Sequence, residues 1–255
     1  MSTKNINLVL SGGGARGIAH IGVIEVLEAQ DYTIRSISGT SMGALVGAVY
    51  TSGKLTEFKD WLLTLSKLDV FKLMDFTLSK QGFIKGDKIF DKMKAFINPV
   101  NIEDLPIPLS ISATNITTNQ EVVFKTGPLI EAVRASISIP SVFTPVTKGN
   151  EILIDGGVVN NLPISTIQRF DGDLLVVVDV NRTHTVEDSK NKLGYFDIMN
   201  KSLLLLMEKV TELNIEKYNP DIVINVSGES ANILDFHKAE SMLEIGIKNA
   251  KKCLL

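Results

Sequence analysis

The stretch that most constrains the fold of this chain is Gly39-Thr40-Ser41-Met42-Gly43, which matches the pattern G-x-S-x-G. Residues 32–38 before it read as a strand, and residues 44–52 after it read as a helix. At such a turn the glycines let the backbone bend sharply, and the positive end of the helix favours an oxyanion beside the serine. The pattern predicts a nucleophilic Ser41 in an α/β fold. A tight turn with a buried, capped serine is the alternative interpretation.

Charge, cysteine content and hydropathy exclude several classes of protein. The net charge of −3 gives no basic excess that would neutralise phosphates, so we expect no nucleic-acid partner. The single cysteine, Cys253, leaves no disulfide framework and no cysteine metal site. The chain shows neither a signal peptide nor an apolar run of about 18 residues, and we therefore expect a cytoplasmic protein.

A glycine loop follows the first expected strand. Residues 6–10 are a short apolar run, residues 11–17 read Ser-Gly-Gly-Gly-Ala-Arg-Gly, and apolar residues then recur with helical spacing. The loop fits the dinucleotide fingerprint G-x-G-x-x-G, but that function needs an acidic residue at the end of the second strand. The second strand, residues 32–38, has no acid at its end, so a dinucleotide site is disfavoured.

The same glycines suit an oxyanion hole. Gly12, Gly13 and Gly14 leave backbone N–H groups bare beside a helix N-terminus, which favours negative charge. If the first two strands are parallel neighbours, this loop and the Ser41 turn lie side by side at the carboxyl edge of the sheet, where ligands bind. Arg16 would add a cation that steers an anionic substrate. A surface or carboxylate-paired arginine is the alternative.

Residues 54–100 differ in composition from the rest of the chain. They hold six of the eleven phenylalanines, the only tryptophan (Trp61), and nine lysines against six acidic residues. Helical patches at 56–65 and 87–97 flank an irregular, glycine-punctuated middle. One interpretation is a helical insertion with its own small core. The other is a cap over the serine that contacts acyl chains or a lipid surface, because aromatic residues together with lysines suit an interface.

The remaining segments continue the α/β pattern, and one of them presents an aspartate. Strands are expected at 108–115, 121–124, 151–154, 174–180 and 222–226, and helices at 129–135, 197–217 and 239–252. The strand at 151–154 leads into Asp155-Gly156-Gly157, which places a carboxylate at a site of close backbone approach; an ordinary Asp-Gly turn is the alternative. Without a repeat or a clear linker, we expect residues 1–255 to form a single domain that carries the 54–100 insertion.

Four motifs in this order resemble the patatin-like phospholipases, and more closely their short bacterial members related to the neuropathy target esterase domain. The motifs are the glycine loop at 11–17, the serine turn at 39–43, Ala-Ser-Ile-Ser-Ile-Pro at 135–140 and Asp-Gly-Gly at 155–157. The resemblance covers about residues 5–180 and implies a three-layer α/β/α sandwich with a mostly parallel central sheet. Ser11 stands where many patatins have aspartate, a difference that removes no catalytic atom.

The same resemblance implies a dyad without histidine, in which Ser41 is the nucleophile and Asp155 the base. It implies an oxyanion hole from the N–H groups of Gly12, Gly13 and Gly14, together with Met42. Further motif positions support these groups: Arg16, Gly17, Gly39, Gly43, Gly156 and Gly157. The implied reaction is calcium-independent hydrolysis of phospholipids, lysophospholipids or other acyl esters, with no cofactor or metal and with contact at the inner membrane surface.

Two other functions stay open from the sequence. One is a Ser–His–acid hydrolase in which His184 or His237 follows Asp155 along the chain. The other is a lipid- or nucleotide-binding module that keeps both loops as binding elements without catalysis. The tail from residue 183 onward lies outside the resemblance, and no feature of the sequence indicates an oligomeric state.

Overall fold

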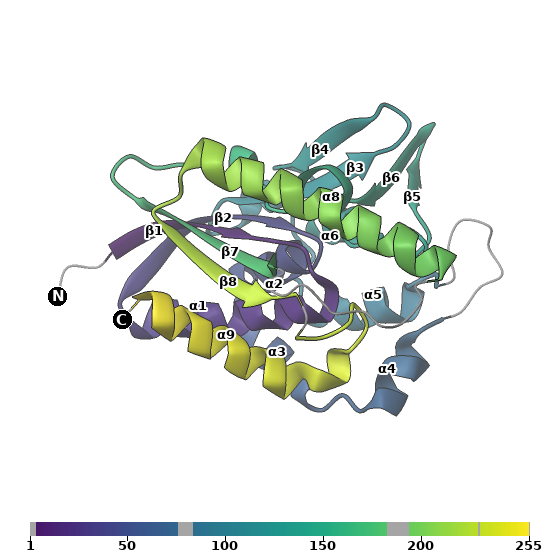
Figure 1. Ribbon diagram of the computed structural model, residues 1–255, viewed down its shortest axis with the longest axis horizontal. Helices are drawn as coiled ribbons and strands as arrows, with labels where there is room; N and C mark the ends of the chain where they lie inside the picture. Colours follow the sequence, from purple (N-terminus) through teal and green to yellow (C-terminus); the bar gives the residue numbers. More distant parts are fainter. Residues whose placement is uncertain (1–3, 76–83, 183–193, 229, 255) are drawn as a thin grey trace.

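A computed structural model describes residues 4–75, 84–182, 194–228 and 230–254, which are organised around a sheet of eight strands (Figure 1). The strand order is β5-β6-β3-β2-β1-β7-β8, and β4 also pairs with β3. The strands are β1 Lys4–Leu10, β2 Tyr32–Thr40, β3 Leu109–Asn115, β4 Gln120–Phe124, β5 Val146–Lys148, β6 Glu151–Asp155, β7 Leu174–Arg182 and β8 Ile222–Ser227.

Five of these strands run parallel, and β4, β5 and β6 pair antiparallel at one side of the sheet. The first two strands are parallel neighbours that pair from Lys4 opposite Tyr32 to Leu10 opposite Gly39, with a register shift between Ile6 and Asn7. Their carboxyl ends therefore carry the glycine loop and the serine turn to the same edge, as the sequence predicts. The mostly parallel central sheet is confirmed.

Helices cover both faces of the sheet, which gives the expected three layers: Figure 1 shows α8 above it and α1 and α9 below it. The helices are α1 Ala19–Ala29, α2 Met42–Thr51, α3 Leu55–Leu63, α4 Lys67–Leu73, α5 Asp87–Met93, α6 Leu129–Ser136, α7 Gly157–Asn160, α8 Tyr195–Tyr218 and α9 Ala239–Leu254. In the described ranges, no helix is both long and apolar enough to cross a membrane.

The central strands are buried on both faces, so their sequences are continuous apolar runs. Successive side chains of a strand point to opposite faces. On β7, Val176 and Val178 join the main hydrophobic cluster with α1, α2 and α9, whereas Val177 packs on the other side with Val9 and Ile215 of α8. This two-sided burial fixes the positions of the strand ends that carry the site.

The 54–100 segment departs from the sequence prediction in two ways. Its middle is not wholly irregular, because α4 forms there, capped by Ser66 with a reciprocal bond to Asp69. Its described aromatic residues do not build a separate core either. Phe58 and Phe96 pack edge to face, with ring centroids 5.4 Å apart, inside the same hydrophobic cluster as the sheet. The buried phenylalanines of the segment therefore belong to the main core.

Candidate active site

Ser41 occupies a strained turn between β2 and α2. Its backbone angles are φ 53° and ψ −121°, a conformation that non-glycine residues rarely adopt and that clusters at functional sites. The two glycines of the pentapeptide are needed because other backbone atoms lie where a Cβ would stand. A Cβ on Gly43 would lie 2.3 Å from the carbonyl oxygen of Leu10, and a Cβ on Gly39 would lie 2.6 Å from the backbone N of Ala44. The nucleophile-elbow geometry expected from G-x-S-x-G is present.

A buried serine from another part of the chain holds this turn. The Ser41 N–H donates to Ser136 Oγ at 2.8 Å, and the Ser136 hydroxyl donates to the carbonyl of Ser112 at 2.7 Å. Two residues later, the carbonyl of Ser138 accepts the N–H of Asp155 at 2.9 Å. The motif at 135–140 thus ties the serine turn and the aspartate to one short segment. The sequence marks this segment as one of the four family motifs but does not indicate what its serines do.

Asp155 lies at the end of β6 and is 6% exposed. One carboxylate oxygen accepts the N–H of Gly157 at 2.7 Å. Burial raises the pKa of the Asp155 carboxyl to about 6, because the charged form loses water; hydrogen bonding from the Ser41 side chain and from the Gly157 N–H partly opposes this rise. The structure therefore brings together the serine and the aspartate that the sequence singles out.

The glycine loop lies against the serine turn. A Cβ on Gly12 would be 3.0 Å from the Cβ of Ser41. The N–H of Gly12 donates to the carbonyl of Asn161 at 3.1 Å, which corrects the expectation that Gly12 offers a donor to the site. Among the residues that the structure describes, none accepts the N–H groups of Gly13, Gly14 and Met42. These three groups are the donors available for an oxyanion.

Gly14 combines a positive φ with close backbone contact, so a side chain there would be strained. Its φ is +57°, and a Cβ there would lie 2.5 Å from the carbonyl oxygen of Ile233. That carbonyl accepts the N–H of Ala15 at 2.9 Å. The tail beyond residue 183, which the sequence left without a role, therefore supports the back of the glycine loop.

Arg16 anchors the loop instead of facing a substrate. Its side chain is buried and donates to the carbonyl of Gly228 at 2.8 Å and to the side-chain oxygen of Asn181 at 2.7 Å. The Asn181 amide in turn donates to the carbonyl of Gly12. Burial lowers the pKa of Arg16, and Asp179 opposes this effect. Neither steering by an exposed cation nor a surface position agrees with this geometry.

The histidines offer no base to Ser41 within the described residues. His20 is fully buried in α1, where its Nε2 bonds to the carbonyl of Ser11 at 2.8 Å and burial lowers its pKa to about 4. His237 lies in the short helix Phe236–Lys238 and is absent from the residues that line the cavity beside Ser41. His184 falls outside the described residues. No group of three or more metal-ligating side chains gathers in the described ranges.

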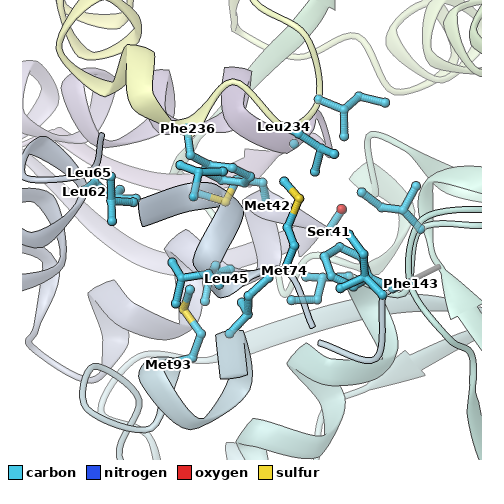
Figure 2. A pocket seen from close by; sticks show the side chains of 18 of the residues that line it. Ser41, Met42, Leu45, Leu62, Leu65, Met74, Met93, Phe143, Leu234 and Phe236 are labelled. Carbon is cyan, nitrogen blue, oxygen red and sulfur yellow. The ribbon is translucent and has the colours of Figure 1, made fainter. Parts of the chain in front are cut away.

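Ser41 opens onto an apolar cavity with an empty volume of about 780 Å³, part of it open to solvent (Figure 2). Figure 2 shows Ser41 near Phe143 and Leu234, with Leu62 and Leu65 at the opposite side. Apart from Ser41, the lining residues are apolar: Gly14, Met42, Leu45, Phe58, Trp61, Leu62, Leu65, Val70, Leu73, Met74, Ile84, Ile89, Met93, Ile137, Ile139, Phe143, Ile233, Leu234 and Phe236. The 54–100 segment and the tail both form its walls.

Fold and site together define a class of protein. It is a three-layer α/β/α protein with a serine on a strand-to-helix elbow, a buried carboxyl beside it and free N–H groups from a glycine loop. Within that class, the chain belongs to the patatin-like phospholipase family, whose family model matches residues 8–167.

Similar proteins agree with this membership. An uncharacterised NTE family protein of Mycobacterium bovis is 41% identical over 180 residues, which are 71% of this chain and 50% of that protein. Lysophospholipase NTE1 of Kluyveromyces lactis is 27% identical over 279 residues, covering 96% of this chain and 19% of that protein. The structure of VipD from Legionella pneumophila shares the fold, with a TM-score of 0.54 at 15% identity over 99% of this chain and 67% of that chain. This chain spans about half the length of the Mycobacterium relative.

Proposed function

We propose that this protein is a serine acyl hydrolase that cleaves carboxylic ester bonds of lipids. The observation that carries the proposal is the position of Ser41, which stands at the wall of an otherwise apolar cavity and beside the buried carboxyl of Asp155. An apolar cavity accepts an acyl chain, and the serine is then placed at the ester end of that chain. Membership of the patatin-like phospholipase family supports the same reaction class.

The proposed mechanism is a two-step acyl transfer through a Ser–Asp dyad. Asp155 accepts the Ser41 proton as Oγ attacks the ester carbonyl, and the developing oxyanion receives hydrogen bonds from the N–H groups of Gly13, Gly14 and Met42. Collapse of the tetrahedral intermediate breaks the ester bond, and Asp155 returns the proton to the departing alcohol. Water then attacks the acyl-enzyme by the same route in reverse. A carboxyl with a pKa of about 6 is a stronger base than an ordinary aspartate.

The substrates we propose are phospholipids, lysophospholipids and other acyl esters of lipids. Among the described residues, the side chains that line the cavity are apolar apart from Ser41 and the indole N–H of Trp61, so a phosphate or glycerol headgroup would stay outside while the acyl chain enters. The name lysophospholipase carried by the Kluyveromyces lactis relative agrees with this substrate class. Because protein groups perform every step above, we propose that calcium is not needed and that EDTA leaves the rate unchanged.

We further propose that residues 1–255 act as one domain in which the 54–100 segment is a cap. The inner side of α4 contributes Val70 and Leu73 to the cavity, whereas Leu68 and Phe71 on its outer side are exposed. A short helix with apolar side chains both on the side that faces the cavity and on the exposed side suits contact with a lipid surface. A cytoplasmic location, peripheral at the inner membrane surface, belongs to the same proposal, and cell fractionation would test it.

The test is to incubate the purified protein with phospholipids, lysophospholipids and neutral acyl esters and to measure the fatty acid released. We expect release by the wild type and none above background by Ser41→Ala. Asp155→Asn keeps the shape of the side chain but removes the proton acceptor, so we expect a loss of several orders of magnitude in kcat. Unchanged release by Ser41→Ala would contradict the proposal. Absence of release from every ester, with folded protein, would favour a binding module.

A further inference from the structure

One helix carries most of the exposed large apolar side chains in the described part of the protein. Leu205 and Leu206 of α8 are 58% and 66% exposed, values that leave most of each side chain in water. The other exposed apolar residues of this helix are Ile198, Met199, Leu203, Leu204, Val210 and Leu213. A bare apolar surface of this extent marks an interaction site.

The two halves of α8 differ in charge and in attachment. Between positions 198 and 206 the sequence has a single charged residue, Lys201, whereas positions 207–217 contain five charged residues. The second half is fastened to the body of the protein: Asn214 donates to Asn160 at 3.2 Å, and Arg182 pairs with Glu212 at 3.4 Å. The described side chains of the first half are exposed on all sides of the helix.

Two kinds of partner would cover such a helix, and its geometry separates them. The residues at 199, 203, 206, 210 and 213 follow the alternating spacing of four and three that packs against another helix, for example in a second copy of this chain. Successive helical residues, however, are turned by about 100°. Leu204, Leu205 and Leu206 therefore point in three directions, and one partner helix would cover only one of them. A hydrocarbon phase covers all three.

The position of α8 relates this surface to the active site. A Cβ on Gly157, two residues beyond Asp155, would lie 2.9 Å from the terminal methyl of Met207 in α8. Figure 1 shows the first turns of α8 at the end of the molecule toward which β7 and β8 point, and α4 lies at that end as well. The first turns of α8 and the helix α4 thus lie at the end of the molecule to which the parallel strands carry the Ser41 turn.

We propose that residues 198–206 of α8 are a docking surface that inserts into the interfacial layer of a lipid bilayer with anionic headgroups. The leucines enter the hydrocarbon boundary, and Lys201 extends to the headgroups. The described residues 54–75 and 84–100 hold eight lysines against six acidic residues, an excess that favours anionic lipid. In one respect this inference rests on the proposed function, because the bilayer would be the source of the lipid ester.

Vesicle flotation tests the docking surface without relying on catalysis. The probes are vesicles of phosphatidylcholine alone and of phosphatidylcholine mixed with phosphatidylglycerol, and the protein is the full chain. We expect the wild type and Ser41→Ala to float equally with the mixed vesicles and less with phosphatidylcholine alone. Leu205→Glu and Leu206→Glu should each reduce the partition coefficient by about tenfold or more, because each removes one leucine from the hydrocarbon boundary.

Leu213→Glu is the matched control, since Leu213 is 63% exposed on the same helix but lies in its charged half. Lipid docking predicts near-wild-type flotation for this variant. Circular dichroism shows that every variant is folded, and for the three leucine variants hydrolysis of a soluble short-chain ester gives a second check. Full flotation of Leu205→Glu and Leu206→Glu would overturn the docking surface. The protein could instead form a dimer in solution. If Leu206→Glu and Leu213→Glu disrupt that dimer equally and Leu205→Glu does not, the lipid docking surface is overturned in favour of an interface with a second copy. Flotation without ester hydrolysis would overturn the proposed function alone.

Discussion

Replacing Asp155 by asparagine should make the protein more stable as well as inactive. The carboxyl is buried, and its pKa in the folded protein is about 6 against an ordinary value of 3.8. The difference of about two units corresponds to about 3 kcal/mol, since each unit is worth about 1.4 kcal/mol. Asparagine retains an oxygen that accepts the Gly157 N–H, and its amide group can donate to the Ser41 hydroxyl. The substitution therefore removes the buried charge and leaves a side chain of the same shape in its place.

The sign of the effect follows from proton linkage. The folded wild type binds the Asp155 proton more tightly than the unfolded chain does, because its pKa is raised. Its free energy of unfolding consequently falls as the pH rises from about 4 to about 6, and then stays level. Asp155→Asn has no such group. The two proteins should be equally stable below pH 4, and the variant should be more stable by about 3 kcal/mol above pH 7.

The assay is urea unfolding of both proteins at a series of pH values between about 4 and 8. For a chain of this size, the expected gap at neutral pH corresponds to a rise in Tm of roughly 6–12 °C. A difference in free energy of unfolding that does not change with pH, or a variant that is less stable at pH 8, would refute the reasoning. In that case burial would not raise the pKa of Asp155, and Asp155 would be no stronger a base than an ordinary aspartate.

Three further predictions concern the base, the oxyanion hole and the cavity. His184→Ala and His237→Ala should hydrolyse a short-chain ester within about twofold of wild type, whereas a loss of several orders of magnitude in either would identify a histidine base. Gly14→Ala should lower kcat on the order of 100-fold and also lower the urea midpoint, because its Cβ would meet Ile233; a fully active variant would place the oxyanion elsewhere. Leu65→Trp should reduce the rate on hexadecanoyl relative to butanoyl esters by about tenfold, since it narrows the far side of the cavity, and an equal loss on both would contradict this.

Much of the site was predictable because its signals are local in the sequence. A strand, a turn with two glycines and a helix specify the Ser41 elbow within about twenty residues. The adjacency of the glycine loop follows from the parallel pairing of two consecutive strands. An apolar strand and a pair of glycines mark Asp155 locally, whereas its role as the base is implied by the family resemblance.

The parts that sequence reasoning missed depend on contacts between distant segments. Ser136 belongs to the motif at 135–140, but it lies 95 positions from the serine turn that it holds, so its hydrogen bond to Ser41 was not visible from the sequence. Arg16 reaches residues more than 160 positions away, so its burial was not visible from its own loop. The helix α4 did have a local signal, the capping box of Ser66 and Asp69, which was overlooked. The cavity is lined by five separate stretches of the chain, around positions 14, 41–45, 58–93, 137–143 and 233–236, and had no sequence pattern of its own.

The measurement that tests the account most directly is covalent labelling with a fluorophosphonate, located by peptide mass spectrometry and timed across pH. We expect a single label on Ser41, none in Ser41→Ala, and a labelling rate that falls with acidity around pH 6, where Asp155 takes up its proton. Asp155→Asn should label slowly at every pH, while His184→Ala should label at the wild-type rate. A label on another residue, or undiminished labelling of Asp155→Asn, would contradict a Ser41–Asp155 dyad.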